Sequence, residues 1–457
     1  MKRNALNDLI KWNNNSRRKP LIVWGARQVG KTYLIKDIFA ESYYKDSYLY
    51  LDCKIEDEIR KFCSQTANPK KIIEYISLLK GHSISEKTLL IFDEIQECPN
   101  LISALKYFCQ EYREIPIIAT GSMVRIKIQR ESQKRDSKES EKFLFPVGKI
   151  DQLTIYPMTF DEFLMNYNSV LYDTIKKAHI EKIPLEAKIH EMAMEQLYKY
   201  LLVGGMPEAV DTYLTTDDLL QSREVLKTLY DNYLSDMELY QASREAILRS
   251  RSLFSNIYRE LNRETKNFSP GLIEKNSKTR DFATSIQWLT MAHIVNQSFQ
   301  LKEHVTMPLM KDEDSHFRMY LCDIGMFSYQ SGLNAASFIS NDRENTLSGI
   351  FFENYCAAEL TAKGIALFYW KGKTSSEIEF IVESANSLYP LDVKKGKSKL
   401  NSLSKFSEHN KFNFAIKVSR NNFGYSPSQK LLTVPLYFMP FLSSDLANGT
   451  IVLPQNN

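Results

Sequence analysis

The sequence predicts an α/β protein that starts with a parallel sheet, continues as a helical region and ends in a second α/β region. Over the first third of the chain, short apolar runs alternate with helical segments, as is typical of buried parallel strands. From about residue 186 the apolar spacing becomes helical, and strand patterns return near residue 366. The length of 457 residues suits about three domains, which we expect at 1–185, 186–335 and 336–457.

Five strands are expected in the first region. The segments that predict them are Leu21–Trp24, Tyr48–Leu51, Leu89–Phe92, Ile115–Ala119 and Leu153–Tyr156. A short amphipathic helix is expected before them, at Asn4–Trp12. Residues 127–142 interrupt the pattern with six basic and four acidic residues. This tract is interpreted either as a solvated loop or frayed helix, or as a basic finger that touches nucleic acid.

The segment Gly25–Thr32, with the sequence GARQVGKT, fits the phosphate-binding P-loop pattern between a strand and a helix. Its glycines let main-chain N–H groups face phosphate oxygens, and the helix N-terminus favours negative charge. Lys31 is expected to reach the β- and γ-phosphates of ATP, and Thr32 to offer a hydroxyl to Mg²⁺. The predicted nucleotide-binding residues are Gly25, Ala26, Arg27, Gln28, Val29, Gly30, Lys31, Thr32 and Tyr33. A plain helix-capping turn is the alternative.

The segment LLIFDE places Asp93 and Glu94 at the carboxyl end of a buried strand. We expect Asp93 to hold Mg²⁺ and Glu94 to act as the general base that activates water. The alternative is that both acids only cap the next helix. The segment IIATGS ends the fourth strand with Thr120 and Ser122, and Ser122 is the predicted contact to the γ-phosphate or the attacking water, against a simple turn.

Composition excludes several classes of protein. The chain has 59 Lys and Arg against 55 Asp and Glu, a net charge of +4, so it is no wholesale polyanion binder. Its 43% hydrophobic content excludes a long disordered chain. The six cysteines form no C-x-x-C pair. Neither a signal peptide nor a membrane-spanning run is visible, so a cytoplasmic location without membrane contact is expected.

Taken together, these segments resemble bacterial and archaeal AAA-type ATPases that carry a C-terminal domain of unknown function with a restriction-endonuclease-like fold. The matching stretches are LIVWGARQVGKT, LLIFDEIQ, IIATGS, FPVGKIDQLTIYPMTFDEFL, LLVGGMPEAV, FRMYLCDIGMF, GIFFENYCAAEL and EIEFIVE…YPLDVKKGK. The resemblance implies an AAA-type P-loop domain, a winged-helix-type middle region and a nuclease-like end. It also implies that Pro207 lies near the nucleotide, although Pro207 equally suits the first turn of a helix. Lys149 departs from the family, which commonly has Arg there.

In the middle region, residues 269–299 have the order short helix, turn, longer helix and strand, which suits a winged-helix unit. Lys278, Thr279, Arg280 and Ser285 lie where such a helix enters a DNA groove. The same segment carries Phe282, Ile286, Trp288 and Leu289, enough for a core-facing side. The unit therefore either binds DNA or packs against protein.

The C-terminal region contains a predicted hairpin of Glu377–Glu383 and Leu388–Lys394, in which Glu379 faces Asp392 and Glu377 faces Lys394. These side chains, with Glu353 from the preceding helix, resemble the metal-binding PD-(D/E)xK nuclease pattern, and they are a tentative second site of Glu353, Glu379, Asp392 and Lys394. Glu379 and Asp392 each differ by one methylene from the commoner residues of that pattern. The alternative is a solvent-facing side with a Glu377–Lys394 pair.

We therefore expect an ATPase that uses ATP and Mg²⁺ to drive domain motion. One rival hypothesis is a nucleotide-gated switch that hardly hydrolyses ATP, and another is an ATP-regulated, metal-dependent DNA nuclease. The candidate partners are double-stranded DNA, other proteins and further copies of the same chain. Arg27, Arg113, Arg125 and Lys149 are the cations near the expected site, and the sequence does not choose among them.

Overall fold

The computed structural model describes residues 1–121, 145–241, 243–311, 316–333, 349–372, 376–394 and 401–454. It divides into two compact units: Arg3–Tyr156, and Met1–Lys2 together with Pro157–Asn457. We describe each unit by itself and call them the N-unit and the C-unit. The three-domain division expected from the sequence stays a prediction. Ser122, Arg125 and the charged tract 127–142 lie outside the described residues.

The N-unit is built on a sheet of five parallel strands, as predicted. Its order is β2-β3-β4-β1-β5. The strands are β1 (Leu21–Trp24), β2 (Tyr48–Asp52), β3 (Leu89–Asp93), β4 (Ile117–Thr120) and β5 (Asp151–Thr154). The last strand lies two residues earlier than predicted, because Asp151 already pairs with Leu21 and the pairing ends at Trp24 and Thr154.

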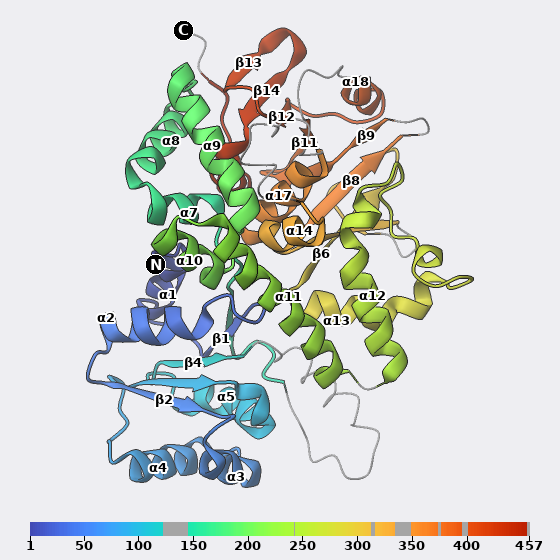
Figure 1. The fold of residues 1–457 in the computed structure, drawn as a ribbon. Coiled ribbons are helices and arrows are strands. Elements are labelled where there is room, and N and C mark those ends of the chain that lie inside the picture. Colours follow the sequence, from blue (N-terminus) through green and yellow to red (C-terminus); the bar gives the residue numbers. More distant parts are fainter. Residues whose placement is uncertain are drawn as a thin grey trace. The chain divides into compact units, whose positions relative to one another are not determined.

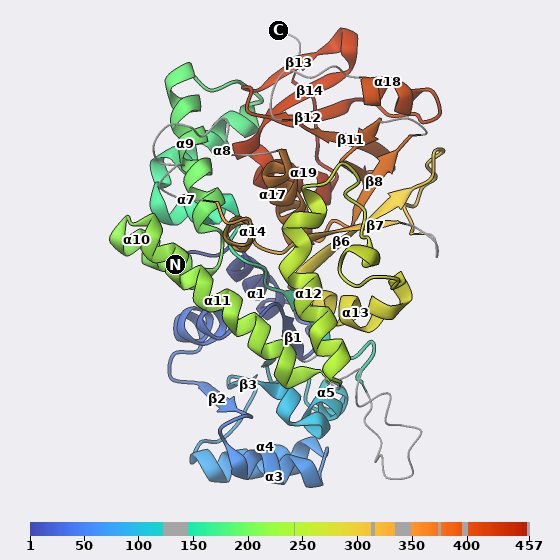
Figure 2. The same ribbon diagram turned by 45° about the vertical axis from the view of Figure 1, so that its right-hand side comes forward.

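Helices cover both faces of this sheet (Figures 1 and 2). They are α1 (Ala5–Asn13), η1 (Tyr33–Ala40), α2 (Glu41–Tyr43), α3 (Asp57–Gln65), α4 (Pro69–Lys80), η2 (Ile95–Glu97) and α5 (Pro99–Glu111). Helices α3, α4 and α5 pack on one face, where Ile59, Ile76 and Leu105 join Phe92 in a fully buried core. Helix η1, which follows Thr32, is a π-helix rather than an α-helix.

Helices dominate the first half of the C-unit. They are α7 (Phe160–Tyr167), α8 (Ser169–Glu181), α9 (Ala187–Val203), α10 (Pro207–Thr216), α11 (Leu219–Tyr240), α12 (Arg244–Leu261), η4 (Pro270–Leu272), η5 (Thr279–Phe282), α13 (Ala283–Met291) and α14 (Ile324–Gln330). Its later helices are α17 (Gly349–Ala362), α18 (Asn401–Ser407), η6 (Pro427–Gln429), η7 (Leu436–Phe438) and α19 (Met439–Asn448).

Two mixed sheets complete the C-unit, with the orders β7-β6-β8-β9 and β10-β11-β12-β14-β13. Their strands are β6 (Val295–Leu301), β7 (Phe317–Leu321), β8 (Leu367–Lys371), β9 (Glu377–Ile378), β10 (Phe380–Ser384), β11 (Ser387–Val393), β12 (Ala415–Ser419), β13 (Gly424–Ser426) and β14 (Leu431–Pro435). Strand β6 pairs antiparallel with β7 and parallel with β8. The strands that follow α13 therefore share a sheet with a strand of the C-terminal region.

The order α12, α13, β6, β7 is compatible with the predicted winged-helix unit. Phe282, Ile286, Trp288 and Leu289 are buried, which confirms the expected core-facing side. Ser285 is also buried and donates a hydrogen bond to the carbonyl of Ala246 at 3.2 Å, so this side chain does not face a groove. Lys278, Thr279 and Arg280 are exposed.

The C-terminal hairpin has the predicted register, since Phe380 pairs with Leu391 and Ser384 with Ser387. The continuous first strand predicted at Glu377–Glu383 is wrong. It is split into β9, which pairs with β8, and β10, which pairs with β11. Glu379 lies at the break, where one predicted strand passes from one sheet to the other.

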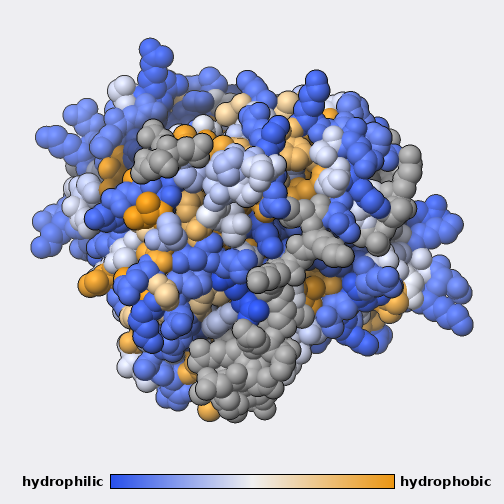
Figure 3. Space-filling model, turned by 90° about the horizontal axis from the view of Figure 1, so that it is seen from above, coloured by the Kyte–Doolittle hydropathy of each residue, from blue (hydrophilic) through white to orange (hydrophobic). Residues whose placement is uncertain are grey.

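Among the described residues, no helix is long and apolar enough to cross a membrane. Hydrophilic residues cover most of the face drawn in Figure 3, and its hydrophobic residues are divided among small groups. Scattered apolar residues of this kind are ordinary on protein surfaces.

Candidate nucleotide site

The segment Gly25–Thr32 joins the end of β1 to the start of η1, as a P-loop requires. Three of its residues have a positive φ angle: Gly25 at 143°, Gln28 at 64° and Gly30 at 82°. At Gly25 only glycine fits, because a Cβ atom there would lie 2.2 Å from the carbonyl oxygen of Ile155. The loop is thus held against the chain that leaves β5.

Lys31 turns its ammonium group into this loop. Its Nζ donates hydrogen bonds to the carbonyl oxygens of Gly25 at 3.1 Å and Ala26 at 2.7 Å. The side chain is buried, and burial lowers the pKa of Lys31 to about 8. The cation is therefore held by neutral dipoles, and an arriving phosphate would meet a positive charge that is poorly compensated.

Thr32 and Asp93 meet, as expected for two groups that share one ion. The Thr32 hydroxyl donates to Asp93 Oδ2 at 2.7 Å. Tyr50, on the neighbouring strand β2, donates its hydroxyl to the same oxygen at 2.8 Å. The other oxygen of Asp93 accepts the main-chain N–H of Glu94 at 2.9 Å. Three neutral donors thus fix a buried carboxylate.

Glu94 follows directly, in a left-handed main-chain conformation with φ of 49°. Burial is the main cause of a raised pKa for Glu94. Gln96 donates its side-chain amide to the Glu94 carboxylate. Gln96 itself is buried, and its Oε1 atom has no hydrogen-bond partner among the described residues.

Tyr50 and Gln96 were not predicted as site residues. Tyr50 lies inside strand β2, and the apolar pattern of that strand does not indicate that its hydroxyl bonds to Asp93 on the neighbouring strand. Gln96 stands two residues after Glu94 in the quoted motif LLIFDEIQ, and this spacing was the available signal.

The remaining predicted residues are placed less decisively. Thr120 ends β4 fully buried, and its hydroxyl has no partner among the described residues. Ser122, the predicted contact, lies outside those residues. Arg113 bonds the carbonyl oxygen of Cys109 at 3.3 Å, and Lys149 is half-buried. Pro207 is the first residue of α10 in the C-unit, so its place relative to the P-loop is not described.

Residues 17–164 match the family model of an AAA domain. The N-unit carries an AAA-type P-loop ATPase domain. Residues 194–337 and 348–438 match two domains of unknown function, DUF8612 and DUF4143. These two matches leave the winged-helix and restriction-endonuclease-like interpretations as predictions.

Individual relatives are distant. An uncharacterized protein, MJ1637 of Methanocaldococcus jannaschii, is 26% identical over 238 residues, which cover 49% of this chain and 44% of that protein. The matched part thus spans less than half the length of this relative. Among solved structures, the Walker-type ATPase PABY2304 of Pyrococcus abyssi has a TM-score of 0.42 at 14% identity, covering 72% of this chain and 95% of that one. A DNA replication initiation factor has a TM-score of 0.23 at 14% identity, covering 63% and 86%.

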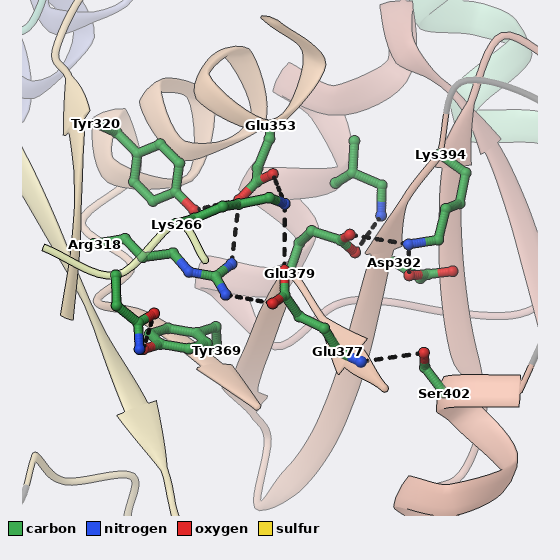
Figure 4. Close-up of polar contacts among 12 residues, drawn as sticks. Lys266, Arg318, Tyr320, Glu353, Tyr369, Glu377, Glu379, Asp392, Lys394 and Ser402 are labelled. Atoms are coloured by element: carbon green, nitrogen blue, oxygen red, sulfur yellow. Dashed lines mark hydrogen bonds and ion pairs between the residues drawn. The ribbon is translucent and has the colours of Figure 1, made fainter. Parts of the chain in front are cut away.

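Outside the ATPase domain, a dense group of charges lies in the C-unit (Figure 4). We call it the charged network. Its residues are Lys266, Arg318, Tyr320, Glu353, Tyr369, Glu377, Glu379, Asp392 and Lys394. They come from the loop after α12, from β7, α17, β8, β9 and β11, from the break between β9 and β10, and from the residue after β11.

The predicted second site is divided within this network. Lys394 Nζ lies 2.9 Å from Glu379 and 2.7 Å from Asp392. Glu353 has other partners, namely Lys266 at 2.5 Å, Arg318 at 3.3 Å and the Tyr320 hydroxyl at 2.6 Å. The acids Glu379 and Asp392 are buried, so the alternative of a solvent-facing side is wrong.

The predicted Glu377–Lys394 pair is also wrong. Glu377 instead binds Arg318 at 2.6 Å and Lys266 at 3.2 Å. Arg318 is almost completely buried, and its guanidinium stacks 3.9 Å from the centre of the Tyr369 ring. These cations were missed because they lie far from the hairpin in sequence.

A magnesium site does not fit the charged network as it stands. In the part of the chain that the structure describes, no group of three or more Asp, Glu, His or Cys side chains is placed to hold a metal ion. The carboxylates of the network form ion pairs with lysine and arginine side chains instead. At the nucleotide site, by contrast, the side-chain donors that the described residues bring to Asp93 are the neutral hydroxyls of Thr32 and Tyr50, so Thr32 and Asp93 offer oxygen ligands suited to Mg²⁺.

Proposed function

We propose that the ATPase domain hydrolyses ATP with Mg²⁺ and that this reaction drives motion of the C-unit. The observation that carries the proposal is the contact of the Thr32 hydroxyl with Asp93 at 2.7 Å, one residue before Glu94. It brings the P-loop and the acidic strand end together as phosphoryl transfer to water requires.

In this proposal each residue has one task. The loop Gly25–Thr32 cradles the phosphates with its N–H groups, and Lys31 gives up its carbonyl partners to bind phosphate oxygens. Thr32 and Asp93 would hold Mg²⁺, which neutralises charge on the phosphates when it is bound. Glu94 accepts the proton of the attacking water. Because burial raises its pKa, the Glu94 carboxylate is a stronger base than an exposed one.

The test is ATP turnover by the full chain and by two variants. Lys31→Ala and Glu94→Gln should each lower turnover by about a hundred- to a thousandfold. Glu97→Gln, which makes the same change of charge three residues further on, is the matched control and should leave turnover unchanged. Full turnover by Lys31→Ala would refute the proposal. If Glu94→Gln neither slows turnover nor traps ATP, the nucleotide-gated switch is the better account.

Adding double-stranded DNA to the same assay tests whether nucleic acid is the partner of the ATPase. Turnover that rises with DNA and is lost in Glu94→Gln would support nucleic acid as the working partner. Turnover indifferent to DNA would direct the search to protein partners, including further copies of the chain.

The nuclease hypothesis has one supporting observation, the meeting of Glu379, Asp392 and Lys394 at the switch between two sheets. The cations that neutralise the network favour a structural or DNA-binding role over cleavage. Metal-dependent DNA cleavage by the full chain that disappears in Asp392→Ala would restore the nuclease hypothesis. Absence of cleavage, or cleavage untouched by this change, would remove the assigned site.

A further inference from the structure

The chain passes twice between its two units. Lys2 belongs to the C-unit and Arg3 to the N-unit, and the chain returns to the C-unit between Tyr156 and Pro157. Lys2 is fixed within the C-unit by two hydrogen bonds to Asn166. Its main-chain N–H donates to Asn166 Oδ1 at 2.7 Å, and Asn166 Nδ2 donates to its carbonyl oxygen at 3.0 Å. The first passage is therefore anchored directly beside Arg3.

Arg3 joins the two passages within the N-unit. Its guanidinium donates to the carbonyl oxygen of Tyr156, the last residue of this unit, at 2.6 Å. Its other terminal nitrogen donates to the carbonyl oxygen of Val29, in the middle of the P-loop, at 3.1 Å. The side chain is only 8% exposed. One planar cation thus connects the nucleotide-binding loop to both places where the chain leaves the unit.

The P-loop also touches the second passage directly. Gly25 lies so close to Ile155 that a Cβ atom would be 2.2 Å from its carbonyl oxygen. The N–H of Ile155 donates to the carbonyl oxygen of Trp24 at 2.9 Å. A shift of the loop on binding phosphate would therefore displace the main chain at Ile155 and Tyr156.

On the other side of this passage, Met158 is held firmly in the C-unit. The N–H of Met158 donates to the carbonyl oxygen of Gly205 at 2.6 Å, and the Tyr200 hydroxyl donates to the carbonyl oxygen of Met158 at 2.6 Å. The N–H of Gly205 is in turn bound by buried Asp323 at 2.6 Å. Between the two anchored ends stands Pro157, whose ring fixes its own φ angle.

We propose that Arg3 is a positioning residue that couples nucleotide binding at the P-loop to the C-unit through Tyr156, Pro157 and Met158. The inference rests on the proposed nucleotide site. A guanidinium offers a rigid, planar set of donors, so it transmits a movement of Val29 to Tyr156 better than a flexible ammonium does. The sequence analysis did not single out Arg3, because this residue precedes the first predicted helix.

The experiment compares the wild type with Arg3→Met, with Arg3→Lys and with Arg17→Met, an exposed matched control. Binding of a slowly hydrolysed ATP analogue with Mg²⁺ is measured first, and Arg3→Met should weaken it by about three- to tenfold. Hydrogen exchange of the amides at 158–160 and 200–206 is then followed with and without saturating analogue. The wild type and Arg17→Met should change their exchange there, and Arg3→Met should lose most of this change although nucleotide is bound.

Arg3→Lys keeps the charge and should retain part of the response, and it decides the matter if Arg3→Met does not fold. A wild-type exchange response in saturated Arg3→Met, even in a less stable protein, would overturn the inference and leave Arg3 a merely structural residue. A wild type that binds the analogue without any response at these amides would overturn it too. A wild type that binds no nucleotide would instead refute the proposed function, and that failure is visible before any variant is made.

Discussion

The nucleotide site and the charged network both bury carboxylates and cations, but the charged groups have different kinds of partner in the two regions. At the nucleotide site the charged groups have neutral hydrogen-bond partners. Lys31 binds two main-chain carbonyls, and Asp93 binds two hydroxyls. In the charged network each acid has a cationic partner, such as Arg318 for Glu377 and Lys394 for Asp392. The charges of the nucleotide site therefore stay available to a bound ligand, whereas those of the charged network neutralise one another.

The pKa values follow the same division. Burial raises the pKa of Glu94, which has an amide partner. Burial alone would also raise the pKa of Glu377, yet Arg318 and Lys266 hold it below the ordinary value. Glu379 is the exception, because deep burial raises its pKa to about 7 despite Lys394, and nearby Asp392 adds to the effect. The pKa of these acids is therefore raised where burial outweighs the partners and lowered where two cations outweigh burial.

The largest expected effect comes from breaking the network at its most buried cation. Arg318→Met removes one of the two cations that bind Glu377 and one of the two that bind Glu353, so Lys266 alone is left to compensate both acids. The free energy of unfolding of the C-unit should fall by about 3–5 kcal/mol. Chemical denaturation of the full chain, followed by a probe in the C-unit, measures this loss.

Arg280→Met is the matched control for that change, because Arg280 lies in the same unit with its side chain 80% exposed. It should alter stability by less than about 0.5 kcal/mol. Equal losses for the two variants would mean that the network contributes no more than a surface arginine. ATP turnover by the folded protein should be the same in both.

A smaller effect is expected at Asp323, a buried acid of the C-unit with neutral partners. It accepts N–H groups from Gly205 and Met326, and burial raises its pKa from 3.8 to about 6. Its folded pKa lies above its unfolded one, so its stabilising contribution is complete below about pH 4 and is lost as pH rises through about 6. The stability difference between the wild type and Asp323→Asn should therefore shift by about 2–3 kcal/mol between pH 4 and 7.

Asp445→Asn is a control with the opposite sign. Burial favours the neutral form of Asp445, but hydrogen bonds from His179 and Lys182 hold its pKa below the ordinary value. The contribution of Asp445 is present above its unfolded pKa and is lost as pH falls. The stability difference between the wild type and Asp445→Asn should therefore stay nearly constant between pH 4 and 7 and shrink only as pH falls below about 4. A difference for Asp445→Asn that instead shrinks as pH rises through about 6, as expected for Asp323→Asn, would contradict the division by partner charge.

The sequence was sufficient wherever the pattern is local. Four strands of the N-unit follow from short runs rich in apolar residues, whereas the fifth, with the sequence DQLT, lies two residues before its predicted place. The hairpin register follows from its alternation and short turn. The break at Glu379 could not be predicted, because it depends on β8 as a second partner for the strand. The contacts of Arg3 with Tyr156 and of Arg318 with Glu377 join residues far apart in the chain. No spacing rule reports such pairs, and each was found only in the folded structure.

The smallest effect tests the nucleotide side of the comparison. Tyr50→Phe removes one neutral donor from Asp93 and keeps the ring that lies 4.6 Å from Lys36 Nζ. A hydrogen bond to a charged group contributes about 1.5 kcal/mol, so the free energy of unfolding should fall by up to about this amount. Loss of the same contribution in the transition state lowers turnover by about tenfold. The Mg²⁺ concentration for half-maximal turnover should rise as well, because Asp93 loses a fixed orientation. Tyr48→Phe, on the same strand with its hydroxyl on exposed Glu41, is the matched control and should behave as the wild type. If Tyr50→Phe also keeps wild-type turnover and magnesium dependence, Thr32 and the main chain are enough to orient Asp93. The Tyr50 hydroxyl would then not be one of the neutral donors on which the nucleotide site depends.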